Sequence, residues 1–275
     1  METILTPGTI ALFLDSLSER GRSGNTVRAY SADLHGLRAW TTTQPSVPST
    51  FEKIAATYLN QTRSTASPKT TTRRLSSFKS FAKFHGEVIL ADYIAPSPAK
   101  QEAHPIEEGI SGVRTMIEMA STQWERALVS LTGLIGLRVS EARSIKPSNF
   151  DLTRGLSSIT VTVRGKGDKT RVVPVSLEAW SALESRMAEC ISSDAMLVPV
   201  SDSGARRAFT RLGKEAGLCR RVASHDGRAT VATTALNEGA NIRVVQDILG
   251  HSSVTTTQLY TKVTMDQMRE AVNFK

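Results

Sequence analysis

The stretch SHDGRATVATTALNEGANIRVVQDILGHSSVTTTQLYTKV, residues 224–263, decides the fold. Its apolar residues recur at helical spacing over 227–238 and again over 241–249. Asn241 is a capping residue at the start of the second segment, and Gly250 is of the type that ends helices. The pattern predicts two consecutive helices. Residue types that commonly carry out chemistry lie at both ends of the stretch: His225, Arg228, His251 and Tyr260.

Two stretches upstream extend this pattern. TGLIGLRVSEARSIKPSNFDL, residues 132–152, places Arg138 and Glu141 three residues apart. SSITVTVRGKGDKTRVVPV, residues 157–175, alternates apolar and polar residues on both sides of a Gly-Lys-Gly-Asp turn, which predicts a β-hairpin with Lys166 in its turn. We therefore expect this part of the chain to be mainly helical with one small hairpin. Further helices are expected around 176–191 and 204–216.

The first part of the chain has a different organisation. Amphipathic periodicity predicts four short helices, within 8–21, 23–40, 50–61 and 69–86. Asn25 is the expected cap of the second helix. The run IAPSPAKQEAHP then carries three prolines in a short polar segment, which is typical of a linker. We expect a helical domain at 1–94, a linker at 95–105, and a second domain at 106–275 with a tail at 262–275.

The charge balance restricts the class of partner. The net charge is +8 and the pI is about 9.7, which favours a polyanionic partner. Nucleic acid and an anionic membrane surface both fit. No apolar run approaches the roughly 20 residues of a membrane span, and the amino terminus lacks the basic region of a signal peptide, so we expect a cytoplasmic protein. The cysteines, Cys190 and Cys219, form no CxxC pair and are expected to be half-buried; no HExxH pattern indicates a metal site.

Basic residues gather on the last helix expected in the first domain. Small hydroxyl residues accompany them, a composition suited to contact with a phosphate backbone. A solvated helix face would have a similar composition. The candidate DNA-binding residues are Lys69, Arg73, Arg74 and Lys79 on this helix, with Lys169 and Arg171 on the hairpin.

Together, these stretches resemble the tyrosine recombinases of the phage-integrase class over most of residues 20–265. The first domain, with SGNTVRAYSADLHGLRAW at 23–40 and TTTRRLSSFKSF at 70–81, looks like the family's core-binding domain. The resemblance places the family's catalytic arginines at Arg138 and Arg228, its lysine at Lys166, its histidines at His225 and His251, its nucleophile at Tyr260, and its supporting acidic residue at Glu141.

The chemistry of phosphodiester cleavage requires these residue types. The attacked phosphate gathers negative charge, and Arg138 and Arg228 can each donate a bidentate pair of hydrogen bonds to it. A tyrosine with a pKa near 10 is a poor nucleophile at neutral pH, so His225 is the candidate base that assists it. Lys166 is the candidate proton donor for the 5′-oxygen leaving group, and His251 would hydrogen-bond the phosphate.

The resemblance also implies an architecture and a reaction. The fold would be mainly α with a small β-hairpin or sheet, in two domains that close around duplex DNA as a C-shaped clamp. Dimers on inverted half-sites would pair into a tetramer, and cleavage through a 3′-phosphotyrosine would lead to a Holliday junction. Neither ATP nor a divalent metal is implied, and accessory DNA-bending or directionality proteins are candidate partners.

Several alternatives stay open at this point. The biological role fits a compact phage integrase, an Xer-type resolvase or a recombinase of a mobile element. A DNA-binding or architectural protein that has lost catalysis is a second class, and the intact set of catalytic residue types argues against it. A type IB topoisomerase is a third class, and the short length and the tail after Tyr260 favour a recombinase over it.

The sequence departs from the family pattern at the start of the helix that carries the two catalytic residues. The usual HxLRH is His225-Asp226-Gly227-Arg228-Ala229 here. A glycine in place of the leucine predicts a looser helix start. Tyr30 and Tyr93 lie in apolar stretches of the sequence, so we expect them to be packing residues and not nucleophiles.

Overall fold

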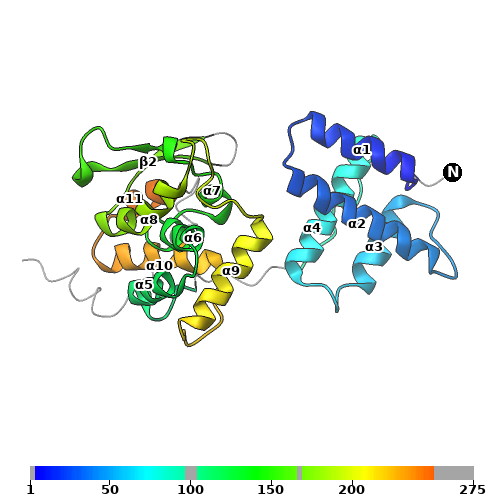
Figure 1. Cartoon of the computed structure of the whole chain (residues 1–275). Coiled ribbons are helices and arrows are strands. Elements are labelled where there is room, and N and C mark those ends of the chain that lie inside the picture. Colours follow the sequence, from blue (N-terminus) through cyan, green and yellow to red (C-terminus); the bar gives the residue numbers. More distant parts are fainter. Residues whose placement is uncertain (1–3, 97–103, 166–168, 251–275) are drawn as a thin grey trace, which may run out of the picture. The chain divides into compact units, whose positions relative to one another are not determined.

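The chain divides into two compact units, Met1–Gln101 and Glu102–Lys275. The computed structural model describes residues 4–96, 104–165 and 169–250 (Figure 1). Each unit has its own hydrophobic core. No helix in these ranges combines the length and apolar character that crossing a membrane demands.

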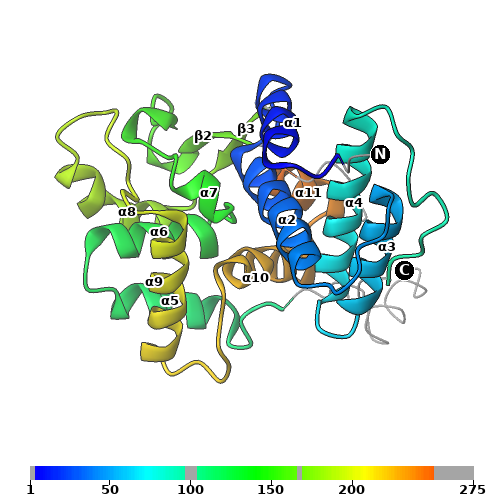
Figure 2. The same ribbon diagram turned by 90° about the vertical axis from the view of Figure 1, so that its right-hand side faces the viewer.

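The amino-terminal unit is a bundle of helices (Figure 2). Phe13, Phe78 and Phe81 are almost completely buried at its centre, where the rings of Phe13 and Phe81 meet edge to face. Tyr30 stacks on Phe13 and Tyr93 packs against the same core, so both are packing residues as predicted. The predicted helices are confirmed as α1 (Pro7–Glu19), α2 (Gly24–Thr42), α3 (Phe51–Gln61) and α4 (Pro68–Phe84).

The cap of α2 differs from the prediction. The hydroxyl of Ser23, and not the amide of Asn25, accepts the hydrogen bond from the backbone N–H of Thr26. Asn25 lies inside the first turn, where its side chain accepts from Arg28. Serine and asparagine are almost equally good caps, so the spacing of the apolar residues could not separate the two positions.

The carboxyl-terminal unit is arranged around α6, which contacts α5, α8, α9 and α10 (Figure 1). The flanking segment before α7 supplies Leu137 to the same core, and the sheet supplies Val161 and Val173. The helices of this unit are α5 (Gly109–Met119), α6 (Gln123–Gly133), α7 (Val139–Ala142), α8 (Leu177–Glu189), α9 (Asp202–Glu215), α10 (Ser224–Asn237) and α11 (Ile242–Leu249), with short 3-10 turns at Pro147–Asn149 and Leu156–Ser158.

The predicted hairpin is confirmed as β2 (Thr160–Arg164) and β3 (Thr170–Pro174), paired antiparallel. A further strand, β1 (Phe150–Asp151), pairs with β2 and was not predicted, because two residues are too few to show alternation. The fold is therefore mainly helical with a small antiparallel sheet, as expected. Cys190 is half-buried, but Cys219 is exposed and not half-buried as expected.

The expected loose start of α10 is wrong. The helix begins at Ser224, three residues before the predicted 227, and Gly227 lies where the backbone of α6 comes close. A Cβ on Gly227 would lie 3.0 Å from Cζ of Phe209 and 3.3 Å from Cα of Gly133. The glycine therefore permits close packing of α10 against α6 and α9.

We expect Gly227→Leu, which introduces the residue usual in the family, to destabilise the protein by about 1–3 kcal/mol through overpacking. Helix propensity alone predicts the opposite sign, a gain of up to about 1 kcal/mol. Chemical denaturation followed by circular dichroism measures the difference. Phe209→Leu in the Gly227→Leu background should recover part of the loss, and equal or greater stability of the single variant would contradict the packing argument.

Candidate functional site

Arg138 and Glu141 lie at the two ends of the first turn of α7. Glu141 is buried, with a side chain only 4% exposed. One of its oxygens, Oε2, accepts the backbone N–H of Arg138 at 2.9 Å, and Oε1 accepts Nη1 of Arg138 at 2.8 Å. The predicted three-residue spacing thus brings the carboxylate onto the guanidinium. Because the Arg138 side chain remains 42% exposed, its guanidinium is accessible to a ligand.

Arg171 reaches the same carboxylate from β3. Its guanidinium is bidentate on Glu141, with Nη1 at 3.0 Å from Oε1 and Nη2 at 2.9 Å from Oε2. Its Nε donates to the carbonyl of Ile248 at 2.9 Å. Gly250, with φ of +64°, lies against it: a Cβ there would be within 3.0 Å of the guanidinium carbon. With its side chain only 14% exposed, Arg171 is built into the site.

Arg228 approaches from α10. It is buried, and its Nη1 lies 3.8 Å from Oε2 of Glu141. Nη1 also donates to the carbonyl of Gly136 at 2.8 Å, and Nη2 donates to the carbonyl of Leu249. Three guanidiniums from three separate elements therefore surround one carboxylate, which leaves an excess of positive charge. Such an excess in a partly dry site favours an anionic ligand.

The three guanidiniums also hold the end of α11. Arg171 binds the carbonyl of Ile248 and Arg228 that of Leu249, while Nη2 of Arg138 lies 3.4 Å from the carbonyl of Gly250. The last carbonyls of a helix carry its partial negative charge, so cations stabilise them. The carboxyl end of α11 thus lies at the arginine cluster.

The electrostatics of Glu141 follow from these contacts. Burial opposes ionisation, but hydrogen bonds from Arg171 and from the backbone of Arg138, with the charges of both arginines, lower the pKa of Glu141 to about 2. The carboxylate is therefore ionised throughout the physiological range. It reduces the repulsion among guanidiniums that would otherwise meet without a counter-charge.

His225 stands in the first turn of α10, with its side chain 72% exposed. Its Nδ1 contacts Oδ1 of the buried Asp226, and this interaction raises the pKa of His225 above its ordinary value, against the effect of burial. Burial also opposes ionisation of Asp226, yet hydrogen bonds from His225, Ala223 and Arg220 lower the pKa of that carboxyl. Since Nδ1 faces Asp226, Nε2 is the ring nitrogen left for a substrate.

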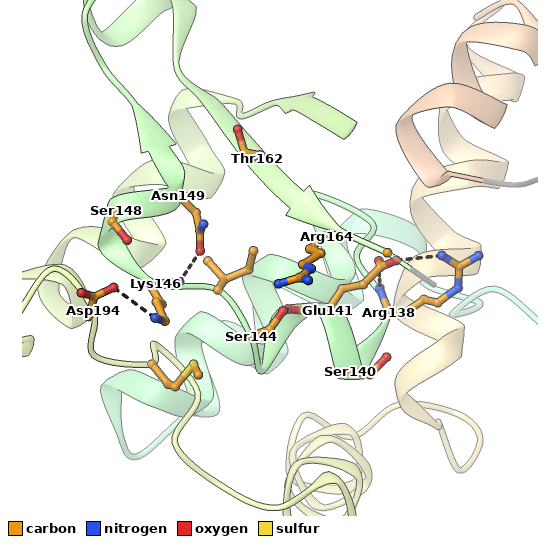
Figure 3. Close-up of a pocket in the computed structure, with 13 residues that line it drawn as sticks. Arg138, Ser140, Glu141, Ser144, Lys146, Ser148, Asn149, Thr162, Arg164 and Asp194 are labelled. Carbon is orange, nitrogen blue, oxygen red and sulfur yellow. Dashed lines mark hydrogen bonds and ion pairs between the residues drawn. The ribbon is translucent and has the colours of Figure 1, made fainter. Parts of the chain in front are cut away.

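A polar hollow of about 990 Å³ opens beside Arg138 and Glu141 (Figure 3). Its far wall carries Lys146, whose Nζ lies 3.0 Å from Asp194, and Arg164 of β2 is drawn close to Glu141. The remaining polar residues of its lining are Ser140, Ser144, Ser148, Asn149 and Thr162.

Three of the predicted site residues, Lys166, His251 and Tyr260, lie outside the residues that the structure describes. The neighbours of Lys166 are described: Arg164 pairs with Thr170 at the end of the hairpin, and the N–H of Gly165 donates to the carbonyl of Lys169 at 2.8 Å. Lys169 itself is exposed.

The basic residues predicted on α4 have two kinds of environment. Lys69 is exposed and Lys79 is half-buried. Arg73 donates to the buried Asp33 at 2.6 Å, and Arg74 lies 4.0 Å from the same carboxylate with its guanidinium over the Tyr58 ring. Asp33 thus neutralises part of the charge that Arg73 and Arg74 would otherwise offer to a DNA phosphate.

Sequence reasoning assigned Arg171 to DNA contact and missed its place in the arginine cluster. One signal was present: in a strand, residues two apart share a face, and Arg171 shares its face with the buried Val173. It also missed a basic face on α9, where Arg206, Arg207 and Lys214 line a shallow hollow of about 650 Å³.

Comparison with known families gives matches over both units. Residues 111–267 match the phage integrase family, and residues 10–86 match the phage integrase N-terminal SAM-like domain. These two ranges cover most of the chain and follow its division into units.

Individual relatives match nearly end to end. The chain is 30% identical to "Tyrosine recombinase XerC" of Listeria monocytogenes serotype 4a (strain HCC23), over 94% of this chain and 93% of that protein. Its sequence is 27% identical to that of the chain in the crystal structure of XerA recombinase, and the two structures match with a TM-score of 0.53 over 96% of each chain. A lambda integrase tetramer bound to a Holliday junction shares the fold, with a TM-score of 0.69 at 18% identity over 90% of this chain and 77% of that one.

Proposed function

The chain belongs to the phage integrase family, and from that premise we propose that the arginine cluster around Glu141 binds the DNA phosphate that Tyr260 attacks. The protein is a site-specific tyrosine recombinase, an enzyme that cleaves and rejoins DNA strands. The comparisons give no support to a non-catalytic or topoisomerase alternative.

The observation that carries the proposal is the meeting of three guanidiniums on a single buried carboxylate. Two of them, on Arg171 and Arg228, are largely shielded from solvent, while Arg138 is accessible beside the hollow. An approaching phosphate would be hydrogen-bonded by Arg138 and attracted by the excess charge of all three. Its negative charge grows in the transition state, so a fixed cationic site stabilises that state more than the ground state.

The remaining roles follow the order of bond changes. The Tyr260 oxygen attacks phosphorus while Nε2 of His225 accepts its proton, because Nδ1 is held by Asp226. The bond to the 5′-oxygen breaks as Lys166 supplies a proton, which leaves a 3′-phosphotyrosine and a free 5′-hydroxyl. His251 adds a hydrogen bond to the phosphate. The reverse reaction with the partner strand rejoins the DNA through a Holliday junction.

We assign Arg171 and Glu141 positioning roles. Arg171 connects β3, whose hairpin turn holds Lys166, with Glu141 and with the end of α11. Its guanidinium is therefore in place before any DNA arrives. This assignment replaces the phosphate contact expected for Arg171 from the sequence.

The DNA and the assembly are also proposals. The lambda integrase named above is a tetramer on a Holliday junction, which supports dimers on inverted half-sites that pair into a tetramer here. Lys69, Lys79 and Lys169 are candidates for phosphate contact, together with the outer edges of Arg73 and Arg74. The XerC relative named above is a bacterial protein, which supports action on DNA in the cytoplasm. Accessory DNA-bending or directionality proteins stay a prediction.

Capture of the covalent intermediate tests the function directly. The protein is incubated with a library of nicked duplexes from which the cleaved strand end diffuses away, and covalent complexes are isolated under denaturing conditions. Sequencing of the attached DNA identifies the half-site, and mass spectrometry of the peptide should place the nucleotide on Tyr260. Attachment at another residue would refute the assignment.

We expect Glu141→Gln to destabilise the protein by about 3 kcal/mol at neutral pH, because it leaves buried guanidiniums without their counter-charge.

The free energy of unfolding of the wild-type protein should depend on pH for the same reason. The pKa of Glu141 is depressed from 4.5 to about 2 on folding, so its contribution is complete above pH 4.5 and disappears as the pH falls toward 2. Urea unfolding at several pH values measures both effects.

Glu189→Gln is the matched control for that prediction. Its carboxylate pairs with Arg186 at 3.0 Å but is half exposed, so we expect a loss of at most about 1 kcal/mol. Equal losses in the two variants would show that Glu141 behaves as an ordinary surface partner.

A further inference from the structure

The guanidinium of Arg220, in the loop before α10, holds two parts of the carboxyl-terminal unit at once. Its Nη2 donates to the carbonyls of His104 and Pro105, at 2.7 and 2.9 Å. Its Nη1 donates to Oδ2 of the buried Asp226 at 2.9 Å. The side chain is only 30% exposed. One planar group therefore connects the segment through which the chain enters the unit with the first turn of α10.

Two more hydrogen bonds fix the same entry segment. The N–H of Ile106 donates to Oγ1 of the buried Thr230 at 2.8 Å, and this hydroxyl donates in turn to the carbonyl of Asp226. The N–H of Cys219 donates to Oε1 of Glu108 at 2.9 Å. Residues 104–108 are thus joined to the loop and to α10 at several points, and two of these points involve Asp226.

Asp226 divides its oxygens between the two sides of this arrangement. Oδ2 accepts from Arg220 and from the backbone of Ala223, whereas Oδ1 faces Nδ1 of His225. The charged groups that act on His225 are Asp226 on its own helix, Arg206 on α9 and Arg220 on the loop. Arg220 therefore influences His225 through a shared carboxylate as well as through its own charge.

We infer that Arg220 is a positioning residue that makes the placement of His225 depend on the docking of the entry segment 104–108. The inference rests on the catalytic role proposed for His225. When Arg220 holds both the segment carbonyls and Asp226, the carboxylate is fixed and the imidazole is oriented by it. When the entry segment is displaced, the Arg220 guanidinium loses the two carbonyl acceptors that hold it in place. Asp226 is then no longer fixed, and His225 loses the carboxylate that orients it.

The first test measures the titration of His225 in the protein without DNA. The chain has five histidines, so the ring signals can be assigned by NMR with a His225→Gln reference. Arg220→Gln should lower the pKa of His225, because an Asp226 carboxylate that Arg220 no longer fixes makes a weaker contact with Nδ1, whereas loss of the Arg220 charge alone would raise that pKa. Arg221→Gln is the matched control: it removes the same charge one residue away, and its side chain is exposed. Equal titrations in the two variants would overturn the inference.

The second test measures the entry segment in the same variants. Hydrogen exchange of the Ile106 amide should be faster in Arg220→Gln than in Arg221→Gln, because the neighbouring carbonyls have lost their donor. Arg220→Lys keeps the charge but cannot serve three acceptors in one plane. We expect it to leave the pKa of His225 close to the wild-type value and still to expose the Ile106 amide. Unchanged exchange in both Arg220 variants would show that the segment is docked independently of Arg220.

The third test is catalytic. At saturating concentrations of the captured half-site, we expect Arg220→Gln to form the covalent intermediate about tenfold more slowly, with unchanged affinity for the DNA. A loss of affinity at an unchanged rate would make Arg220 a DNA contact and overturn the positioning role. The titration and exchange measurements need no DNA. If the wild-type protein never attached to DNA, the proposed function would be refuted, and these two measurements would still test the positioning role of Arg220.

Discussion

Tyr260→Phe is expected to abolish covalent attachment to DNA and to leave the affinity for a half-site duplex unchanged. The substitution removes one hydroxyl, which is the nucleophile of the proposed reaction, and it alters none of the guanidiniums around Glu141. The phosphate would still be bound, but no oxygen would be present to attack it. A denaturing gel of the reaction with the captured half-site measures attachment, and a native gel measures affinity.

Tyr30→Phe is the control for this prediction. Tyr30 stacks on Phe13 in the core of the amino-terminal unit, so loss of its hydroxyl should leave attachment intact. A covalent band that persisted in Tyr260→Phe would place the nucleophile elsewhere in the chain.

The second large effect is expected for Lys166→Ala. Loss of the proton donor should slow cleavage by about 10²–10⁴-fold, the usual contribution of general acid catalysis. The defect should largely disappear on a substrate in which sulfur replaces the 5′-bridging oxygen, because a thiolate leaves without a proton. Rates of covalent attachment on the oxygen and sulfur substrates give the comparison.

Lys169→Ala separates this role from a contribution of charge. Lys169 lies on the same hairpin and is exposed, so its removal takes away a similar charge without the proposed proton. Any defect of Lys169→Ala should be the same on both substrates. A Lys166→Ala defect that sulfur did not relieve would assign Lys166 to binding or folding.

The helices could be predicted because their periodicity and boundary residues agree. Asn241 does cap α11, and Gly250 does end it in the left-handed conformation. The start of α10 could not be predicted in this way. The preference of glycine for flexible positions argued for a loose start, and only the neighbouring Phe209 and Gly133 show why a glycine is needed there.

The site could be predicted where the chemistry names a residue type, and not where the partner is a backbone group. Arg138 and Glu141 are close in sequence, and their contact follows from the helical turn. Arg171 meets Ile248 across 77 residues, and Arg220 meets Pro105 across 115. Their acceptors are main-chain carbonyls, which every residue possesses, so no pattern of side chains marks them.

The attachment of α11 to the arginine cluster has an evolutionary consequence. Since the acceptors at 248 and 249 are carbonyl oxygens, substitutions at these two positions can accumulate without removing the attachment, provided that the helix still packs. The donors have no such freedom, because lysine cannot reproduce the fork of a guanidinium. Gly250 has none either, since any side chain would meet Arg171. Drift among descendants of this chain should therefore be unequal across three adjacent positions: other apolar residues that fill the space of Ile248 and Leu249 keep the attachment, whereas Gly250 cannot change.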